Sequence, residues 1–115
     1  MVRAYVTYMK KVAANLKKYN CKMYYLSVNP VNSAMIKSVG GKARSEAQIA
    51  SFNRTIYKNL CSGKNKSFTY INSCTNLQMK GWISNRHDMG IIDDLHYSNA
   101  TYLRIFDYCM RYLNR

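Results

Sequence analysis

A buried β-strand is indicated by Lys22-Met23-Tyr24-Tyr25-Leu26-Ser27-Val28, a mostly apolar, β-capable run that ends at Asn29-Pro30. Proline keeps the residue before it out of the helical conformation, so the strand closes at this point. Nearly continuous apolar runs are typical of strands in parallel sheets, which are covered on both faces. The run therefore predicts a parallel strand over about residues 22–28.

A helix and a second strand follow this first strand. The helix is predicted over about residues 46–61 and ends near Gly63. The mostly apolar stripe of this helix recurs at helical spacing: Ile49, Phe52, Asn53, Ile56, Tyr57 and Leu60. The second strand is predicted over about residues 67–71. Strand, helix and strand in this order form a βαβ unit, whose two strands are parallel. Ligands of such sheets bind beyond the carboxyl ends of the strands.

Further helices are predicted at both ends of the chain and before the last segment. Residues 2–19 carry apolar side chains at helical spacing and basic side chains between them. This pattern begins with neither a capping residue nor a preceding strand, so we expect the chain to start inside a larger domain. A short helix is predicted near residues 74–80. Ser98 is the predicted cap of a final helix over about 99–113. The predicted apolar stripe of that helix consists of Tyr102, Ile105, Phe106, Cys109 and Leu113.

Length and composition favour one folded domain over residues 1–115, without internal repeats or a linker. Hydrophobic residues make up 48% of the chain, which includes 11 tyrosines. No apolar run approaches the roughly 20 residues that a membrane-spanning helix needs, so we expect no membrane span. The sequence leaves the cellular compartment open.

The charge balance is strongly basic, with 18 Lys and Arg against five acids and a net charge of +13. Such a chain attracts acidic or phosphate-rich partners. Charge alone is a weak signal, and the sequence contains no DNA- or RNA-binding motif. A solvated basic surface is therefore the favoured interpretation, and nucleic acid is the less favoured partner.

The four cysteines are Cys21, Cys61, Cys74 and Cys109. They form no Cys-x-x-Cys pair and no zinc-binding spacing with the two histidines, so we predict neither a metal nor a cofactor. Cys61 and Cys74 are the candidates for a disulfide, and the sequence leaves that pairing open. Cys109 falls on the apolar stripe of the last helix and is predicted to be a small core residue.

The candidate catalytic residues lie in Asp93-Asp94-Leu95-His96-Tyr97. A carboxylate three residues from an imidazole can accept its Nδ1 proton and hold the ring for general-base work. These are two parts of a hydrolytic triad, with His96 as the base and Asp93 as the orienting acid. Asp94 competes for the orienting role, and the choice between Asp93 and Asp94 stays open. No serine lies in a strand-to-helix elbow of the Gly-x-Ser-x-Gly kind.

Asp93-x-x-His96 with Leu95 and Tyr97, followed by an amphipathic helix, resembles the C-terminal signature of the SGNH/GDSL esterase and acylhydrolase family. Residues 24–31 resemble the family's fourth strand and the loop after it, and residues 49–53 resemble the helix that follows. The resemblance spans nearly the whole chain. It departs from the family at Asp94, where glycine is usual. Two upstream family motifs, Gly-Asp-Ser and Gly-x-Asn-Asp, are absent from this sequence.

The resemblance implies an α/β fold, namely part of a flavodoxin-like, SGNH-type three-layer αβα domain. It also implies a C-terminal portion of a serine esterase or acylhydrolase, in which His96 takes the proton of the serine and Asp93 fixes the imidazole tautomer. The substrate would be an ester of an acylated carbohydrate or lipid, and an N-terminal complementing segment would supply the serine and the oxyanion donors. Alone, the chain is expected to be inactive. The alternative is a small basic α/β module that binds nucleic acid or a protein partner without catalysis.

Overall fold

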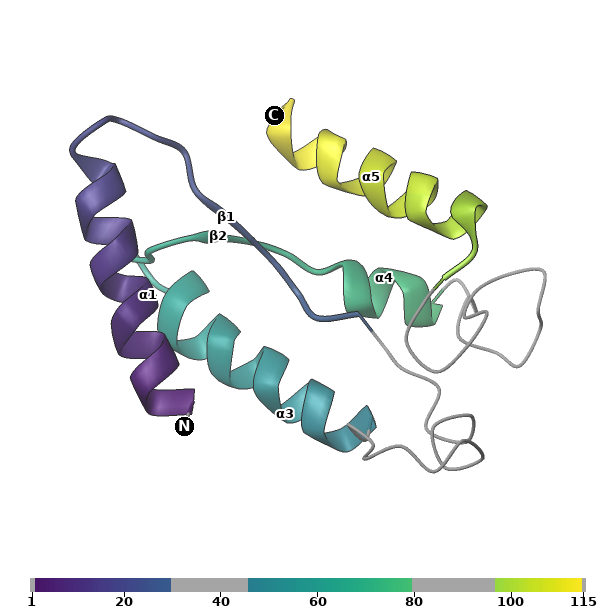
Figure 1. Ribbon diagram of the computed structural model, residues 1–115, viewed down its shortest axis with the longest axis horizontal. Helices are drawn as coiled ribbons and strands as arrows, with labels where there is room; N and C mark the ends of the chain where they lie inside the picture. The colour runs from purple at the N-terminus through teal and green to yellow at the C-terminus, as the bar shows by residue number, and fades with distance from the viewer. Residues whose placement is uncertain (1, 30–45, 80–96, 115) are drawn as a thin grey trace.

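The computed structural model describes residues 2–29, 46–79 and 97–114 as a mixed α/β structure that is mostly helical. Figure 1 shows the path of the chain. The elements in chain order are α1 (Val2–Lys17), β1 (Tyr24–Leu26), α3 (Glu46–Ile56), the π-helical turn η1 (Tyr57–Cys61), β2 (Thr69–Ile71), α4 (Ser73–Met79) and α5 (Asn99–Leu113).

The two strands β1 and β2 pair in parallel, as the βαβ order predicts. Tyr25 lies opposite Tyr70 in the register. The pairing extends beyond both strands, because the Thr69 amide donates to the Met23 carbonyl at 2.9 Å and the Ser27 amide donates to the Ile71 carbonyl at 3.0 Å. The regular strands are nevertheless shorter than the predicted ranges 22–28 and 67–71.

The helix boundaries follow local backbone chemistry. α1 ends at Lys17 rather than at residue 19, because Asn20 takes a left-handed conformation with φ of 56°. Asparagine tolerates that conformation better than most residues. The helix predicted over 46–61 is confirmed as α3 followed by η1. Gly63, with φ of 85°, then turns the chain toward β2, as expected of a glycine after a helix.

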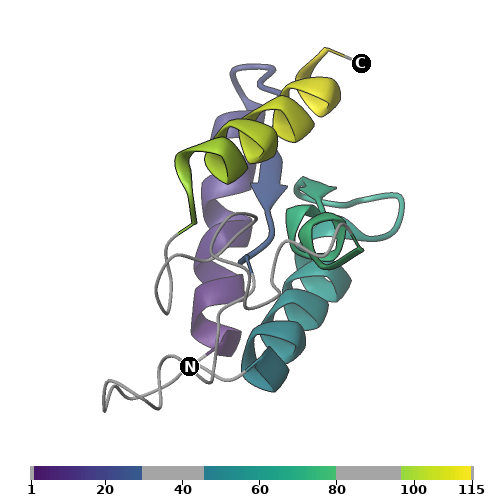
Figure 2. The ribbon, with the colours of Figure 1, turned by 90° about the vertical axis from the view of Figure 1, so that its right-hand side faces the viewer.

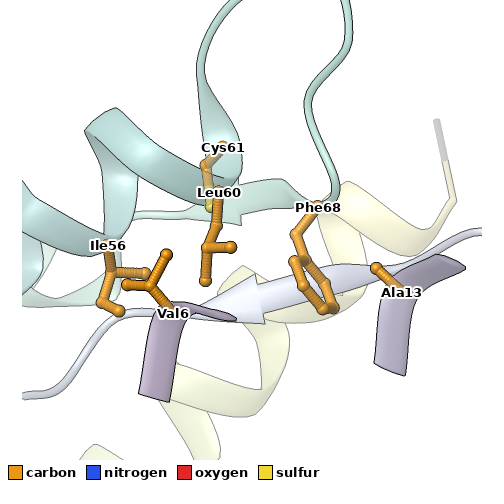
Figure 3. Close-up of a cluster of buried hydrophobic side chains, with 6 residues drawn as sticks. All are labelled: Val6, Ala13, Ile56, Leu60, Cys61 and Phe68. Carbon is orange, nitrogen blue, oxygen red and sulfur yellow. The ribbon is translucent and has the colours of Figure 1, made fainter. Parts of the chain in front are cut away.

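The main core lies between α1, α3, η1 and the segment that leads into β2. Its buried members are Val6, Ala13, Ile56, Leu60, Cys61 and Phe68, which Figure 3 shows in contact across these elements. Ile56 and Leu60 are fully buried, and each such side chain contributes about 1.5–3 kcal/mol to stability. Tyr25 and Tyr70 of the strands pack against this cluster. The core therefore joins the first helix to the βαβ unit.

A second, smaller cluster joins α4 to α5. It contains Leu77, Tyr97 and Ile105, with Cys109 packed against them as predicted. In the view of Figure 1, α5 lies above the strands, α3 lies below them and α1 runs down their left-hand side. Figure 2, turned by 90°, shows α5 running across the upper part of the molecule. The predicted apolar stripe of α5 was too wide, because Phe106 and Leu113 remain 59% and 49% exposed.

Among the described residues, no helix combines the length and the apolar character that crossing a bilayer requires.

Candidate functional site

The carboxyl ends of β1 and β2 meet at one edge of the sheet, and a buried polar network joins them. Ser27 follows β1, and its Oγ accepts a hydrogen bond from the Cys74 amide at 3.0 Å. The Ser27 and Ser73 hydroxyls are 3.5 Å apart, and Ser73 Oγ also donates to Asn29 Oδ1. Both serines are almost completely buried. They therefore serve to hold the two strand ends together.

Asn53 of α3 fixes the same edge from the neighbouring helix. Its Oδ1 accepts from the Val28 amide and its Nδ2 donates to the Val28 carbonyl, each at 2.9 Å. The side-chain amide thus satisfies both backbone groups of Val28, as a neighbouring strand would. Because Asn53 is buried, this pair of bonds positions the exit of β1 firmly against α3.

The beginning of α4 completes the edge on the β2 side. Asn72, the first residue after β2, accepts a hydrogen bond from the Thr75 amide on its Oδ1 at 3.2 Å. Asparagine is a favoured helix N-cap because it satisfies such amides. The cap sets the direction of α4, which carries Leu77 toward α5. The short helix predicted near 74–80 is thereby confirmed.

The predicted catalytic residues Asp93 and His96, and the competing Asp94, lie outside the described residues. The first described residue after them is Tyr97, which is 3% exposed and packs between α4 and α5. Its amide donates to the Tyr102 hydroxyl at 3.1 Å, and the two rings meet edge to face at 5.9 Å. Burial raises the pKa of the Tyr97 hydroxyl, which therefore stays protonated.

Ser98 is the N-cap of α5, as predicted. Its backbone is extended, and its Oγ accepts a hydrogen bond from the Thr101 amide at 3.3 Å. Together, the cap and the buried Tyr97 ring anchor the start of α5 beside α4. The polypeptide is therefore fixed at the position that immediately follows His96.

The cysteines are free thiols, so Cys61 and Cys74 are not bridged. Burial raises the pKa of the Cys61 thiol to about 11, although the nearby Lys66 acts in the opposite direction. A thiol with such a pKa is protonated at neutral pH and is a poor nucleophile. Within the described ranges, no three His, Cys, Asp or Glu side chains gather as metal ligands.

Sequence reasoning missed two features: the polar network of Ser27, Ser73 and Asn29, and the pair of hydrogen bonds between Asn53 and Val28. Asn53 was placed on the apolar stripe of its helix, and a polar residue on a buried face must find a hydrogen-bond partner. That conflict was the signal for a structural role. For the network, the signal was the pair of polar segments that follow two parallel strands, Ser27 to Asn29 and Asn72 to Ser73.

At the described edge of the sheet, these side chains hold the backbone in place and offer polar groups for hydrogen bonds. The residues predicted to be the general base and its orienting acid, His96 and Asp93, belong to the part of the chain that the structure does not describe. Comparison of the chain with protein families, curated proteins and solved structures gives no match.

Proposed function

We propose that this chain is the C-terminal portion of an SGNH/GDSL-type serine esterase or acylhydrolase, with His96 as general base and Asp93 as the residue that orients it. The resemblance of Asp93-x-x-His96 and its flanking segments to that family supports the proposal. The structural observation that carries it is the anchoring of Tyr97 beside α4, the helix that begins where β2 ends.

The argument from position has three steps. In parallel α/β sheets, ligands bind beyond the carboxyl ends of the strands. Here these ends are joined by Ser27 and Ser73, and α4 starts at the same place. Tyr97 contacts α4 through Leu77 and is covalently bonded to His96, and consecutive Cα atoms are about 3.8 Å apart. This supports a site for His96 near the same edge of the sheet.

In the proposed reaction, His96 takes the proton of a serine as that serine attacks the ester carbonyl, and then returns it to the departing alcohol. Asp93 accepts the other imidazole proton and stabilises the imidazolium form. The attacking serine and the oxyanion donors come from an N-terminal complementing segment in this proposal. The substrate is an ester of an acylated carbohydrate or lipid.

The outer edge of β1 is suited to receive such a segment. Odd-numbered residues of this strand direct their backbone groups to β2, as the Met23 and Ser27 hydrogen bonds show. Backbone groups alternate in direction along a strand, so those of Tyr24 and Leu26 are directed away from β2. An added strand would pair there. In this proposal it extends the sheet within a three-layer, flavodoxin-like fold.

The first test is to examine the coding DNA upstream for an in-frame Gly-Asp-Ser. The second measures hydrolysis of p-nitrophenyl acetate by this chain alone and by the chain joined to that upstream segment. We expect turnover only from the joined protein, and a loss of about a thousandfold or more for His96→Ala. The matched control is His87→Ala, which replaces the other histidine of the sequence, predicted to be a surface group, and should keep the activity.

Two results would count against the proposal. Hydrolysis by the isolated chain that His96→Ala abolishes would mean that the nucleophile lies within these 115 residues. Hydrolysis by the joined protein that survives His96→Ala would remove His96 from the mechanism.

A further inference from the structure

A groove of about 880 Å³ lies on the β2 side of the molecule. This volume is within the range of small-ligand sites. The lining comes from α3, η1, β2, α4 and the last turn of α5, and no residue of β1 contributes to it. The lining residues that matter for recognition are Arg54, Tyr57, Lys58, Tyr70, Asn72 and Tyr112. The groove is therefore separate from the outer edge of β1.

As far as the described residues line it, the groove carries positive charge without a compensating acid. Arg54 and Lys58 both line it, four residues apart on consecutive helical turns, and both are exposed. Among the described lining residues none is acidic, and neither cation has a hydrogen-bond or ion-pair partner within residues 2–29, 46–79 and 97–114. Like charges at this spacing repel each other. A bound anion would relieve that repulsion, and the planar guanidinium of Arg54 suits a carboxylate in particular.

An aromatic surface lies beside these cations. Tyr57 is 49% exposed, and its ring packs edge to face against Tyr70 with the ring centroids 5.3 Å apart. The contact holds the Tyr57 ring in place while half of the residue stays accessible. Burial raises the pKa of the Tyr70 hydroxyl, so it remains a neutral hydrogen-bonding group. The π-helical turn that carries Tyr57 and Lys58 is a rare backbone form, found often at functional sites.

We propose that this groove binds an anionic carbohydrate of the uronic-acid class. The sugar carboxylate pairs with Arg54 and Lys58, and the apolar face of a sugar ring packs on Tyr57. Asn72 and Thr75, which also line the groove, supply polar groups for the sugar hydroxyls. The proposal does not rest on the hydrolase proposal, because binding requires no nucleophile.

The same features favour a carbohydrate over single-stranded nucleic acid. A nucleic-acid groove follows a phosphate backbone with a row of cations and stacks successive bases on several rings. Here the described lining has two cations, and its other side chains are aromatic, aliphatic, hydroxyl and amide groups. Such a lining fits a ligand with one anionic group per sugar and many hydroxyls.

The test is calorimetric titration of the protein with an oligogalacturonate, at near-physiological salt. We expect the double variant Arg54→Gln, Lys58→Gln to bind about tenfold or more weakly, because charge-assisted bonds to the carboxylate are lost. Tyr57→Ala should weaken binding in the same direction. The matched control is Lys10→Gln, Lys17→Gln, which removes the same charge from α1 outside this groove and should change affinity little, because salt screens distant charges. Circular dichroism verifies that each variant is folded.

Several outcomes would overturn the proposal. A neutral galactose oligomer that binds as tightly as the oligogalacturonate would remove the role of the carboxylate. Equal weakening in both double variants would show diffuse attraction by net charge. The groove would be a nucleic-acid site if an oligothymidylate bound more tightly than the oligogalacturonate and the Arg54, Lys58 double variant abolished that binding. Absence of oligogalacturonate binding would also refute the proposal. His96→Ala should leave this binding unchanged, whether or not His96 is catalytic.

Discussion

Asn53 shows how one side chain can hold the end of a strand. Its amide donates to and accepts from Val28, a residue 25 positions earlier in the chain. These two bonds satisfy both backbone groups of Val28 in a partly buried environment. Leaving such groups unpaired costs more than the bonds contribute to stability when they are formed.

We expect Asn53→Ala to lower the free energy of unfolding by about 1–3 kcal/mol, because it leaves the Val28 amide and carbonyl unsatisfied. Urea unfolding followed by circular dichroism measures this change. Asn59→Ala is the matched control, because Asn59 is exposed and donates to the Thr55 carbonyl of its own helix. Equal losses of unfolding free energy in the two variants would show that the hydrogen bonds from Asn53 to Val28 contribute no more than an exposed helix bond.

At the scale of elements, α5 illustrates which features are local. Its predicted range of 99–113 and its cap at Ser98 are both confirmed. A cap depends on a residue and the first turn that follows it, so it can be recognised in the sequence. The burial of the helix is different, because Phe106 and Leu113 follow the apolar spacing and yet remain exposed. Which part of a stripe is buried depends on the partner element, here mainly α4.

Ser98→Ala is expected to lower the free energy of unfolding by about 1 kcal/mol, since the Thr101 amide loses its acceptor. Ser98→Asp keeps an acceptor at the cap and should retain most of the stability. Thermal unfolding of the three proteins makes the comparison. If alanine and aspartate at this position destabilise equally, the cap does not hold α5.

At the scale of the whole molecule, the main core couples stability to alkaline pH. Burial raises the pKa of the Cys61 thiol from the ordinary 9.0 to about 11. Burial, reinforced by a hydrogen bond to Tyr5, raises the pKa of the Tyr25 hydroxyl as well. Both groups therefore hold their protons more tightly in the folded protein than in the unfolded chain.

The sign of the pH effect follows from this difference. Below pH 9 the thiol is protonated in both states, and its contribution is fully present. Between about pH 9 and 11 the unfolded chain loses the proton first, so the free energy of unfolding should fall as pH rises. Urea unfolding across this range should show a shallower decline for Cys61→Ala, with Tyr25 accounting for part of the remainder. The control Cys21→Ala, at an exposed site, should keep the full slope; an unchanged slope in Cys61→Ala would contradict this assignment.

Three features could be predicted from the sequence: the order of the elements, the parallel strands and the cap at Ser98. They depend on residues that are neighbours along the chain or on a general rule of crossover handedness. The roles of Asp93 and His96 remain predictions from a motif. Tertiary structure alone decided that Asn53 pairs with Val28, that Ser73 joins Ser27 and Asn29, and that Arg54 and Lys58 face one groove with Tyr112. The physical reason is that helical and strand periodicity shows which face of an element is apolar, whereas contacts between elements depend on how those faces pack in three dimensions.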